Sequence, residues 1–388
     1  MTVQHSIGSA AAKCGGSRSA AQATIFHDGT PTELRGRLSD ITSSGTGHLE
    51  VVKHEPFNAE SPARALIDAI TPASAIFVRS NFAVPALGGE EHRVVVGGAV
   101  LRDFTFSAGE LRSMRESYSS VTMTMECAGN GRLSMRPLPT GELWDAGAVS
   151  TSRWTGIPLR IILERAGVDA SAVEILVEGA DTAANDDRTA GFARALPVSE
   201  AMRDEVLLAF DLNDEPLSAS HGAPLRLLVP GWYGMASVKW VSRISALARP
   251  FEGYFQRERY IYDEPGRVPT PVTRVRVKSI ITSPVDGATC GSGVIDIAGW
   301  AWSGSGHIRR VEVALDGGCG WRDATLHAPE SDFAWTPWSL TMESVLPGRH
   351  TLRSRATDAA GNTQPDMIPW NRHGYGNNAV RLTVFTVE

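Results

Sequence analysis

The chain has 388 residues, of which 42% are hydrophobic and 21% charged, and its formal net charge is -6. This length exceeds what one hydrophobic core usually serves, so we expect two domains. The mild acidity argues against a nucleic-acid-binding protein, which presents a basic domain, but it is compatible with a local basic pocket. The four cysteines are too widely and irregularly spaced for a disulfide framework or a zinc site.

The N-terminal segment is rich in small and polar residues, and we expect residues 1–48 to form a flexible lead. It has neither the apolar core of a signal peptide nor a twin arginine. No apolar run in the chain approaches the ~18 residues that a membrane helix needs. These observations predict a cytoplasmic protein with no membrane partner.

Helices and strands are expected to interleave over residues 49–268, which indicates a mixed α/β domain. A capping serine and Pro62 open a helix over 61–70, and Gly167 is a plausible end for a helix over 155–168. A further helix is expected to run into a strand over 197–212. Strands are expected at 75–85, 94–100, 121–126, 174–181 and 224–234.

The pattern changes at residue 269, after which no helical period is convincing. Strands separated by turn signals are expected at 274–284, 293–302, 307–318, 349–362 and 379–388. Six of the ten tryptophans lie here, enough aromatic area for a core and for one interface. The predicted class is therefore α+β: a mixed α/β domain over 49–268 followed by an antiparallel, immunoglobulin-like β-sandwich over 269–388.

Cys127 is the first candidate for chemistry, because it ends a predicted strand in the segment ECAGNGR at 126–132. A lone cysteine is more often a small core residue. Here, however, Gly129 and Gly131 allow close approach to the main chain, and Arg132 favours the thiolate. A thiolate in such a turn suits either a transition-metal ligand or a nucleophile.

Several motifs resemble, in order, those of the sulfite oxidase family: FVRSN at 77–81, ECAGNGR at 126–132, ELWDAGAVSTSRWTGIPL at 142–159 and HGAPLRLLVPGWYGMASVKW at 221–240. Segments 299–321 and 368–384 resemble the family's dimerisation domain. The resemblance implies a sulfite oxidase-like fold, a homodimer, and a molybdenum–molybdopterin cofactor whose metal is bound by a cysteine thiolate. Cys127 stands at the position of that cysteine.

The resemblance also implies a set of site residues. Arg79 and Arg132 match arginines that bind the oxyanion, Trp144 a wall of the substrate pocket, and Tyr260 a hydrogen-bonding tyrosine. Without the resemblance, a surface Arg79 and core positions for Trp144 and Tyr260 would be preferred. The implied cofactor-binding residues are Phe77, Asn81, His221, Arg226 and Lys239. Asp181 is either a further pterin partner or an aspartate that caps a loop.

Three departures from the family pattern concern the same pocket. Asn81 stands where the animal enzymes have a histidine. His307 and His373 stand where two pocket arginines are expected, and Arg372 could replace the second of these. Because histidine titrates near neutrality, we hypothesise a substrate affinity that weakens from mild acid to alkaline pH.

The expected function is molybdenum-dependent oxidation of sulfite to sulfate. No haem or flavin segment is expected on this chain, so the electrons would pass to a separate acceptor, a cytochrome or oxygen. The alternatives are a sulfane dehydrogenase-like oxidation on the same fold and a non-catalytic dimeric scaffold. A cysteine hydrolase is disfavoured, because no motif near Cys127 supplies a histidine base.

Overall fold

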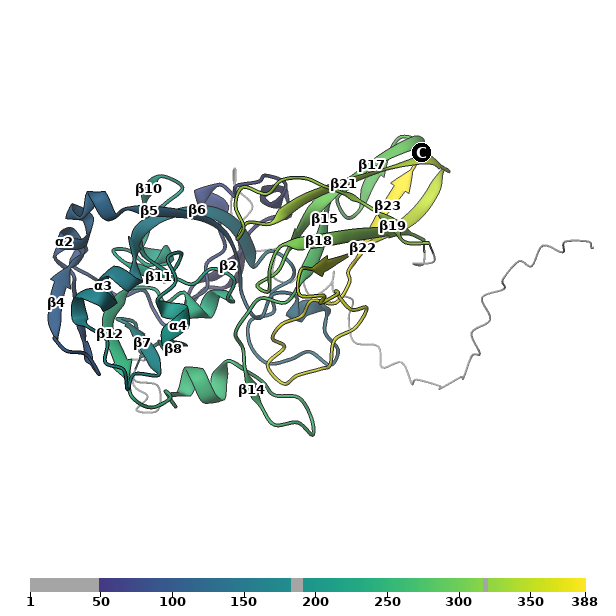
Figure 1. The fold of residues 1–388 in the computed structure, drawn as a ribbon. Helices are drawn as coiled ribbons and strands as arrows, with labels where there is room; N and C mark the ends of the chain where they lie inside the picture. Colours follow the sequence, from purple (N-terminus) through teal and green to yellow (C-terminus); the bar gives the residue numbers. More distant parts are fainter. Residues whose placement is uncertain (1–48, 183–190, 317–319) are drawn as a thin grey trace, which may run out of the picture. The chain divides into compact units, whose positions relative to one another are not determined.

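The structure, a computed structural model, describes residues 49–182, 191–316 and 320–388 (Figure 1). The expected flexible lead at 1–48, with Cys14, lies outside these residues, as does Cys319. No helix within the described ranges is long and apolar enough to cross a membrane.

Two five-stranded sheets dominate the part of the chain before the sandwich. The first is antiparallel, in the order β10-β9-β6-β5, with β11 also pairing β9. The second has the order β4-β3-β12-β7-β8, in which β3 and β12 run parallel. Two short pairs, β1-β2 and β13-β14, accompany them. The strands are β1 Glu50–Lys53, β2 Asn58–Glu60, β3 Arg93–Gly98, β4 Phe104–Ser107, β5 Ser119–Glu126, β6 Val149–Pro158, β7 Glu174–Gly179, β8 Ala193–Pro197, β9 Leu207–Leu212, β10 Glu215–Pro216, β11 Arg226–Leu228, β12 Val241–Leu247, β13 Ile261–Tyr262 and β14 Thr270–Pro271.

The described α-helices are short, and their sequences explain their ends. They are α2 Ala108–Ser113, α3 Leu159–Ala166 and α4 Val198–Ala201. Ser107 and Glu110 form a capping box at the start of α2. The helix α3 ends, as predicted, at Gly167, whose φ of 67° favours glycine. Figure 1 shows α4 close to β7 and β8, which it contacts. The α+β class is confirmed, with less helix than the sequence indicates.

Two expected elements are much reduced. The helix expected over 61–70 is only the 3-10 turn Ala63–Leu66, and the carbonyl of Leu66 at its end accepts a hydrogen bond from Trp300 Nε1 (2.6 Å). The strand expected over 75–85 is a single bridge to β2. In both places the chain makes a hydrogen bond to another segment where regular helix or strand hydrogen bonding was expected. Local sequence does not reveal such contacts.

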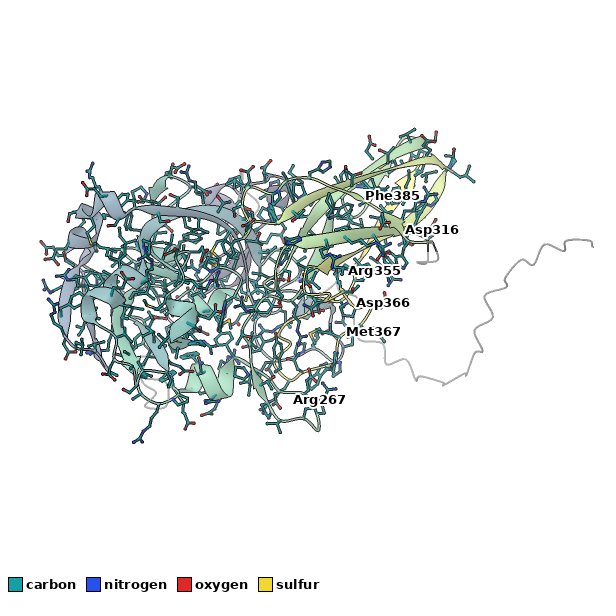
Figure 2. All side chains as sticks on the ribbon, viewed as in Figure 1. Arg267, Asp316, Arg355, Asp366, Met367 and Phe385 are labelled. Atoms are coloured by element: carbon teal, nitrogen blue, oxygen red, sulfur yellow. The ribbon has the colours of Figure 1, made fainter. Side chains whose placement is uncertain are left out.

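A two-sheet β-sandwich follows, with the orders β15-β17-β21-β20 and β16-β23-β22-β18-β19. The sheets share a core that includes Trp338, Leu352 and Phe385, the last labelled in Figure 2. The pairing of β16 with β23 is parallel, so the expected all-antiparallel sandwich is wrong at this edge. The sequence analysis also missed β21. The strands are β15 Lys278–Ser283, β16 Ala288–Cys290, β17 Gly293–Trp302, β18 Ile308–Leu315, β19 Arg322–Asp323, β20 Thr325–Leu326, β21 Thr336–Val345, β22 Gly348–Asp358 and β23 Leu382–Val387.

Most tryptophans of the sandwich are buried, although the sequence suggested that some would be exposed at an interface. Trp300 and Trp335 stack with ring centroids 5.0 Å apart. Trp335 Nε1 donates to Ala69 O (2.8 Å), just as Trp300 binds the preceding turn. A buried indole needs an acceptor for its N–H, and these two find theirs in the residues before β3. The indoles therefore join the sandwich to the rest of its own chain.

We expect Trp335→Ala to lower the free energy of unfolding by about 3–5 kcal/mol, because it opens a cavity and leaves the Ala69 carbonyl without this hydrogen bond. Met367→Ala is the control, since Met367 is 84% exposed (Figure 2), and should change stability by less than about 0.5 kcal/mol. Denaturant unfolding followed by circular dichroism measures both. Equal effects in the two variants would contradict this account of the junction.

Candidate active site

A cavity that is partly open to solvent lies at the end of β5. Its walls come from the loop at 76–81, the residues after β5, the turn Ala219–His221 and the segment 234–240. Most of the site residues expected from the sequence line it: Phe77, Arg79, Asn81, Cys127, Asp181, His221, Arg226, Lys239 and Tyr260. Tertiary folding thus gathers residues that are up to 183 positions apart, from Phe77 to Tyr260.

Cys127 follows β5 directly, and its main chain is fixed on both sides. Its N–H donates to Ala148 O (2.9 Å), and its carbonyl accepts from the N–H of Asn130 (2.9 Å). Gly131 completes the turn with a φ of 90°, a conformation that a side chain would strain. The glycine-rich turn predicted from the sequence therefore shapes the backbone beside the thiol.

The thiol of Cys127 lies in the cavity wall, where only 7% of the residue is exposed. Burial raises the pKa of Cys127, while the positive charges of Arg132 and Arg79 act in the opposite direction. A soft, poorly hydrated sulfur beside two cations is suited to binding a metal as thiolate.

Arg79 presents a cation to the same cavity and is held by several partners. Its guanidinium donates to Asn58 Oδ1 (3.1 Å) and Asn81 Oδ1 (2.7 Å). Its Nη2 also lies 3.3 Å from Glu142 Oε2, and both side chains are mostly buried. Although burial opposes it, the charge of Arg79 holds the pKa of Glu142 below its ordinary value. The cation is thus oriented by amides and partly neutralised by a carboxylate.

Tyr260 closes another side of the cavity. Asn81 Nδ2 donates to its hydroxyl (3.3 Å), and its ring stacks on Tyr375 with centroids 5.3 Å apart. The guanidinium of Arg194 lies 5.7 Å from the Tyr260 ring centroid, and burial lowers the pKa of Arg194 to about 10. The phenol is therefore held in place by an amide, a ring and a buried cation.

Three further basic side chains line the cavity: His221, Arg226 and Lys239. Lys239 Nζ donates to Ser80 Oγ (2.7 Å) and Ser220 O (2.8 Å). Burial lowers the pKa of His221 to about 4 and that of Arg226 to about 9. It also lowers the pKa of Lys239 well below its ordinary value. Arg226 adds to the lowering at both neighbours, so an anion bound here would relieve charge repulsion.

Asp181 lies near these cations and is 4% exposed. Burial raises its pKa to about 6, against the opposing charge of Lys239. Within the described residues its Oδ1 has no hydrogen-bond partner. A buried acceptor of this kind fits a ligand that brings its own N–H groups.

Arg132 and Trp144 do not line the cavity, contrary to the sequence expectation. Arg132 is 2% exposed and donates to the carbonyls of His373 (2.7 Å) and Glu142 (3.1 Å). Trp144 is fully buried and packs in the same apolar cluster as Cys127. Arg132 therefore ties two loops together behind the thiol, and Trp144 is a core residue that a ligand cannot reach.

The residues expected from the sandwich are not in the cavity either. His307 is exposed after β17, and Arg372 is exposed and lies 3.9 Å from Asp263. Burial, followed by the charge of Arg259, lowers the pKa of His373 below its ordinary value. The hypothesised pH-dependent affinity relied on histidines inside the pocket, and neither His307 nor His373 lines it.

The sequence analysis gave no function to Glu142 and Tyr375, although both lay inside quoted motifs. Glu142 sits two residues before Trp144, and only its pairing with Arg79 gives it a function. Tyr375 lies between two glycines with φ of 61° and 65°, a local sign of a constrained loop. Its ring contacts both Tyr260 and the Arg132 guanidinium.

Two family models match the chain. The oxidoreductase molybdopterin binding domain matches residues 81–255, and the Mo-co oxidoreductase dimerisation domain matches residues 270–385. Mitochondrial sulfite oxidase of Rattus norvegicus is 33% identical over 355 residues, which cover 85% of this chain and 64% of that protein. Sulfite oxidase of Gallus gallus is 34% identical and is covered to 75% of its length, with 84% of this chain. The chain thus spans about two thirds of the length of these relatives.

Similarity extends to other enzymes. Nitrate reductase [NADH] of Solanum lycopersicum is 30% identical over 89% of this chain but only 43% of its own length. The crystal structure of the sulfane dehydrogenase SoxCD from Paracoccus pantotrophus superposes with a TM-score of 0.76 and 29% identity, covering 93% of each chain. The fold therefore serves more than one substrate.

The raised pKa of Asp181 predicts a pH-dependent stability in the cofactor-free protein. Its folded pKa of about 6 lies above the ordinary value of 3.8, so the folded state binds the proton more tightly. The associated stability is fully present below pH ~4 and is lost as the pH rises through ~6. The loss is up to about 3 kcal/mol.

We therefore expect the free energy of unfolding, measured by urea denaturation from pH 4 to pH 7, to fall less in Asp181→Asn than in the parent. The exposed Asp68→Asn should keep the parental fall. Parallel curves for parent and Asp181→Asn would show that Asp181 does not titrate as described.

Proposed function

The chain belongs to the sulfite oxidase family of molybdopterin-dependent oxidoreductases, and from that premise we propose that it oxidises sulfite to sulfate and passes the electrons to a separate acceptor. The observation that supports this proposal most is the convergence of Cys127, Arg79 and Tyr260 with three buried basic side chains around one cavity. A thiolate, an oxyanion-binding guanidinium and a phosphate-binding cluster are what such a reaction requires of the protein.

The cavity fits the molybdenum–molybdopterin cofactor of the family. Its phosphate would bind His221, Arg226 and Lys239, whose repulsion it would relieve, and its metal would bind Cys127. Four lining residues have buried atoms without hydrogen bonds in the described part of the chain: Trp154 Nε1, Asp181 Oδ1, His221 Nε2 and Arg226 Nε. These match the polar edge of a pterin, with Phe77 and Asn81 completing its surroundings. When bound, the cofactor supplies the two-electron oxidation of sulfur.

The chain's own side chains bind and orient the anionic substrate. Arg79 remains charged at all relevant pH values, and a planar guanidinium is the side chain best suited to recognise an oxyanion. The Tyr260 hydroxyl can donate to a second oxygen of the same substrate. The overall change is sulfite plus water to sulfate, two protons and two electrons, so the site must also release protons towards solvent.

The remaining expected residues, Arg132 and Trp144, support the site without lining the cavity. Arg132 holds the loops at 142 and 373 through their carbonyls, and its charge favours the thiolate of Cys127. Trp144 packs behind that cysteine. We also propose a homodimer formed through the dimerisation domain at 270–385, and a cytochrome or oxygen as acceptor.

The first experiment is elemental analysis for molybdenum in the purified protein, coupled to sulfite-dependent reduction of ferricyanide. Molybdenum together with sulfite turnover supports the proposal. Molybdenum without turnover of sulfite points to another substrate on the same site. Protein without molybdenum, from a host able to make the cofactor, contradicts the proposal and favours a scaffold.

A second candidate is oxidation of sulfane sulfur. The observation that favours it is the superposition with the sulfane dehydrogenase over 93% of both chains. Parallel assays with sulfite and with thiosulfate, which carries a sulfane sulfur, separate the two. The substrate with the higher kcat/KM identifies the reaction.

We expect Cys127→Ser to abolish turnover by at least ~100-fold while the fold is kept, because a hydroxyl is a poor ligand for a soft metal centre. Cys290→Ser is the matched control, since Cys290 lies on β16 in the sandwich. Sulfite-dependent ferricyanide reduction measures the loss, and circular dichroism checks the fold. Parental activity in Cys127→Ser would exclude this residue as the metal ligand.

We expect Glu142→Gln to lower the KM for sulfite. The carboxylate of Glu142 competes with an anionic substrate for Arg79, and its negative charge repels the substrate. A partly buried ion pair of ~1 kcal/mol corresponds to about fivefold in KM. Glu312→Gln in the sandwich should leave KM unchanged. A raised KM in Glu142→Gln would instead make Glu142 an orienting partner of Arg79.

A further inference from the structure

The carboxylate of Glu126, the last residue of β5, is buried outside the cavity and held by the sandwich. Lys278 Nζ lies 2.8 Å from its Oε1, and Trp302 Nε1 donates to its Oε2 (3.0 Å). Asn130 Nδ2 also donates to Oε1 (3.0 Å). The side chains of Glu126 and Lys278 are 2% and 5% exposed. Both oxygens of the carboxylate are thus bound away from water.

The two donors from the sandwich form one rigid unit. Lys278 on β15 and Trp302 on β17 are directly paired across the two strands. Because β17 is also paired with β21, the strand that carries Trp302 is internal to its sheet. The sandwich therefore presents an ammonium and an indole N–H at a fixed separation.

A buried ion pair of this kind is poor evidence for stability, because desolvating both charges offsets their attraction. What it does provide is a defined geometry, since moving either partner leaves a charge unpaired in the interior. Such a pair is best explained if it fixes the position of a neighbouring atom.

That position is the Cys127 sulfur. Glu126 precedes Cys127, and its partner Asn130 donates from its N–H to the Cys127 carbonyl. The Asn130 Oδ1 accepts from the N–H of Ala148 (3.2 Å), whose own carbonyl accepts from Cys127. A displacement of the carboxylate would therefore reach the cysteine through the chain and through Asn130.

We propose that Glu126, Lys278 and Trp302 are positioning residues that set the place of the Cys127 sulfur in the cavity, so that the sandwich takes part in the active site of its own chain. The inference rests on the proposed function only in taking Cys127 as the metal ligand. The rate at which the Cys127 thiol reacts with a thiol reagent can be measured without the cofactor.

The test uses the full chain, free of cofactor, with Cys14, Cys290 and Cys319 replaced by serine so that Cys127 is the single thiol. The rate of its reaction with dithionitrobenzoate is measured well below the unfolding temperature. Lys278→Met should raise this rate about tenfold or more, because the unpaired carboxylate loosens the turn. Trp302→Phe, which removes one donor and keeps most of the ring, should raise it about threefold.

Arg355→Met is the matched control. Arg355, labelled on the sandwich in Figure 2, pairs with the buried Glu312 (2.8 Å) and has no contact with the cysteine turn. It should leave the Cys127 rate within about twofold of the parent, whatever its effect on the melting temperature. Unchanged rates in both Lys278→Met and Trp302→Phe would overturn the proposal. A rise as large in Arg355→Met would also overturn it, because general loosening would then explain the effect.

If Lys278→Met does not fold, Trp302→Phe alone decides between these outcomes. In cofactor-loaded protein, Trp302→Phe should lower kcat with an unchanged KM, since Arg79 is untouched. A lower kcat accompanied by a changed KM would overturn the assignment. Absence of molybdenum from the parent would refute the proposed function instead, and the thiol rates would still decide the positioning.

Discussion

Removing a carboxylate from water requires hydrogen-bond donors that replace the water. This requirement determines the contacts of the buried Glu126 carboxylate, on which the surrounding segments converge. Its two oxygens accept from Lys278, Trp302 and Asn130, so β5, the cysteine turn and two sandwich strands meet at one group. The main chain beyond it leads directly to Cys127. The sandwich is consequently part of the architecture of the site, and its indoles at 300 and 335 hold the turn before β3 in a similar way.

The second constraint is electrostatic. Arg79, Arg226 and Lys239 line the cavity together with one carboxylate, Asp181, while burial lowers the pKa of the remaining basic residue, His221, to about 4. Burial also lowers the pKa of Arg226 and of Lys239, so an anion that binds beside them would favour their charged forms. His221, Arg226 and Lys239 suit the phosphate of the cofactor that we propose for this cavity. Glu142, 3.3 Å from the Arg79 guanidinium, moderates the positive charge of Arg79.

Relatives that act on different compounds share this fold, so specificity must reside in the small set of groups around the metal-binding position. In this chain that set combines Arg79, Asn81 and Tyr260, joined by hydrogen bonds, with Arg132 and Tyr375 behind them. Asn81 is central, because it accepts from Arg79 and donates to the Tyr260 hydroxyl. An amide accepts and donates without changing its charge with pH, whereas a histidine at this position would titrate.

Local pattern determined a good part of this protein. The strand ending at Cys127, the helix stopping at Gly167 and the α+β class with its sandwich were predictable from the sequence. The motifs and the family resemblance indicated nine of the residues that line the cavity, among them Phe77 and Tyr260, but not Trp154 or Phe192. What the sequence could not determine were contacts between distant segments. The helix over 61–70 was reduced to a turn that binds an indole from β17, Arg132 turned to backbone carbonyls, and His307 and His373 lay outside the cavity. Each of these outcomes depends on which groups compete for one donor or acceptor in space, and only the tertiary structure decides that competition.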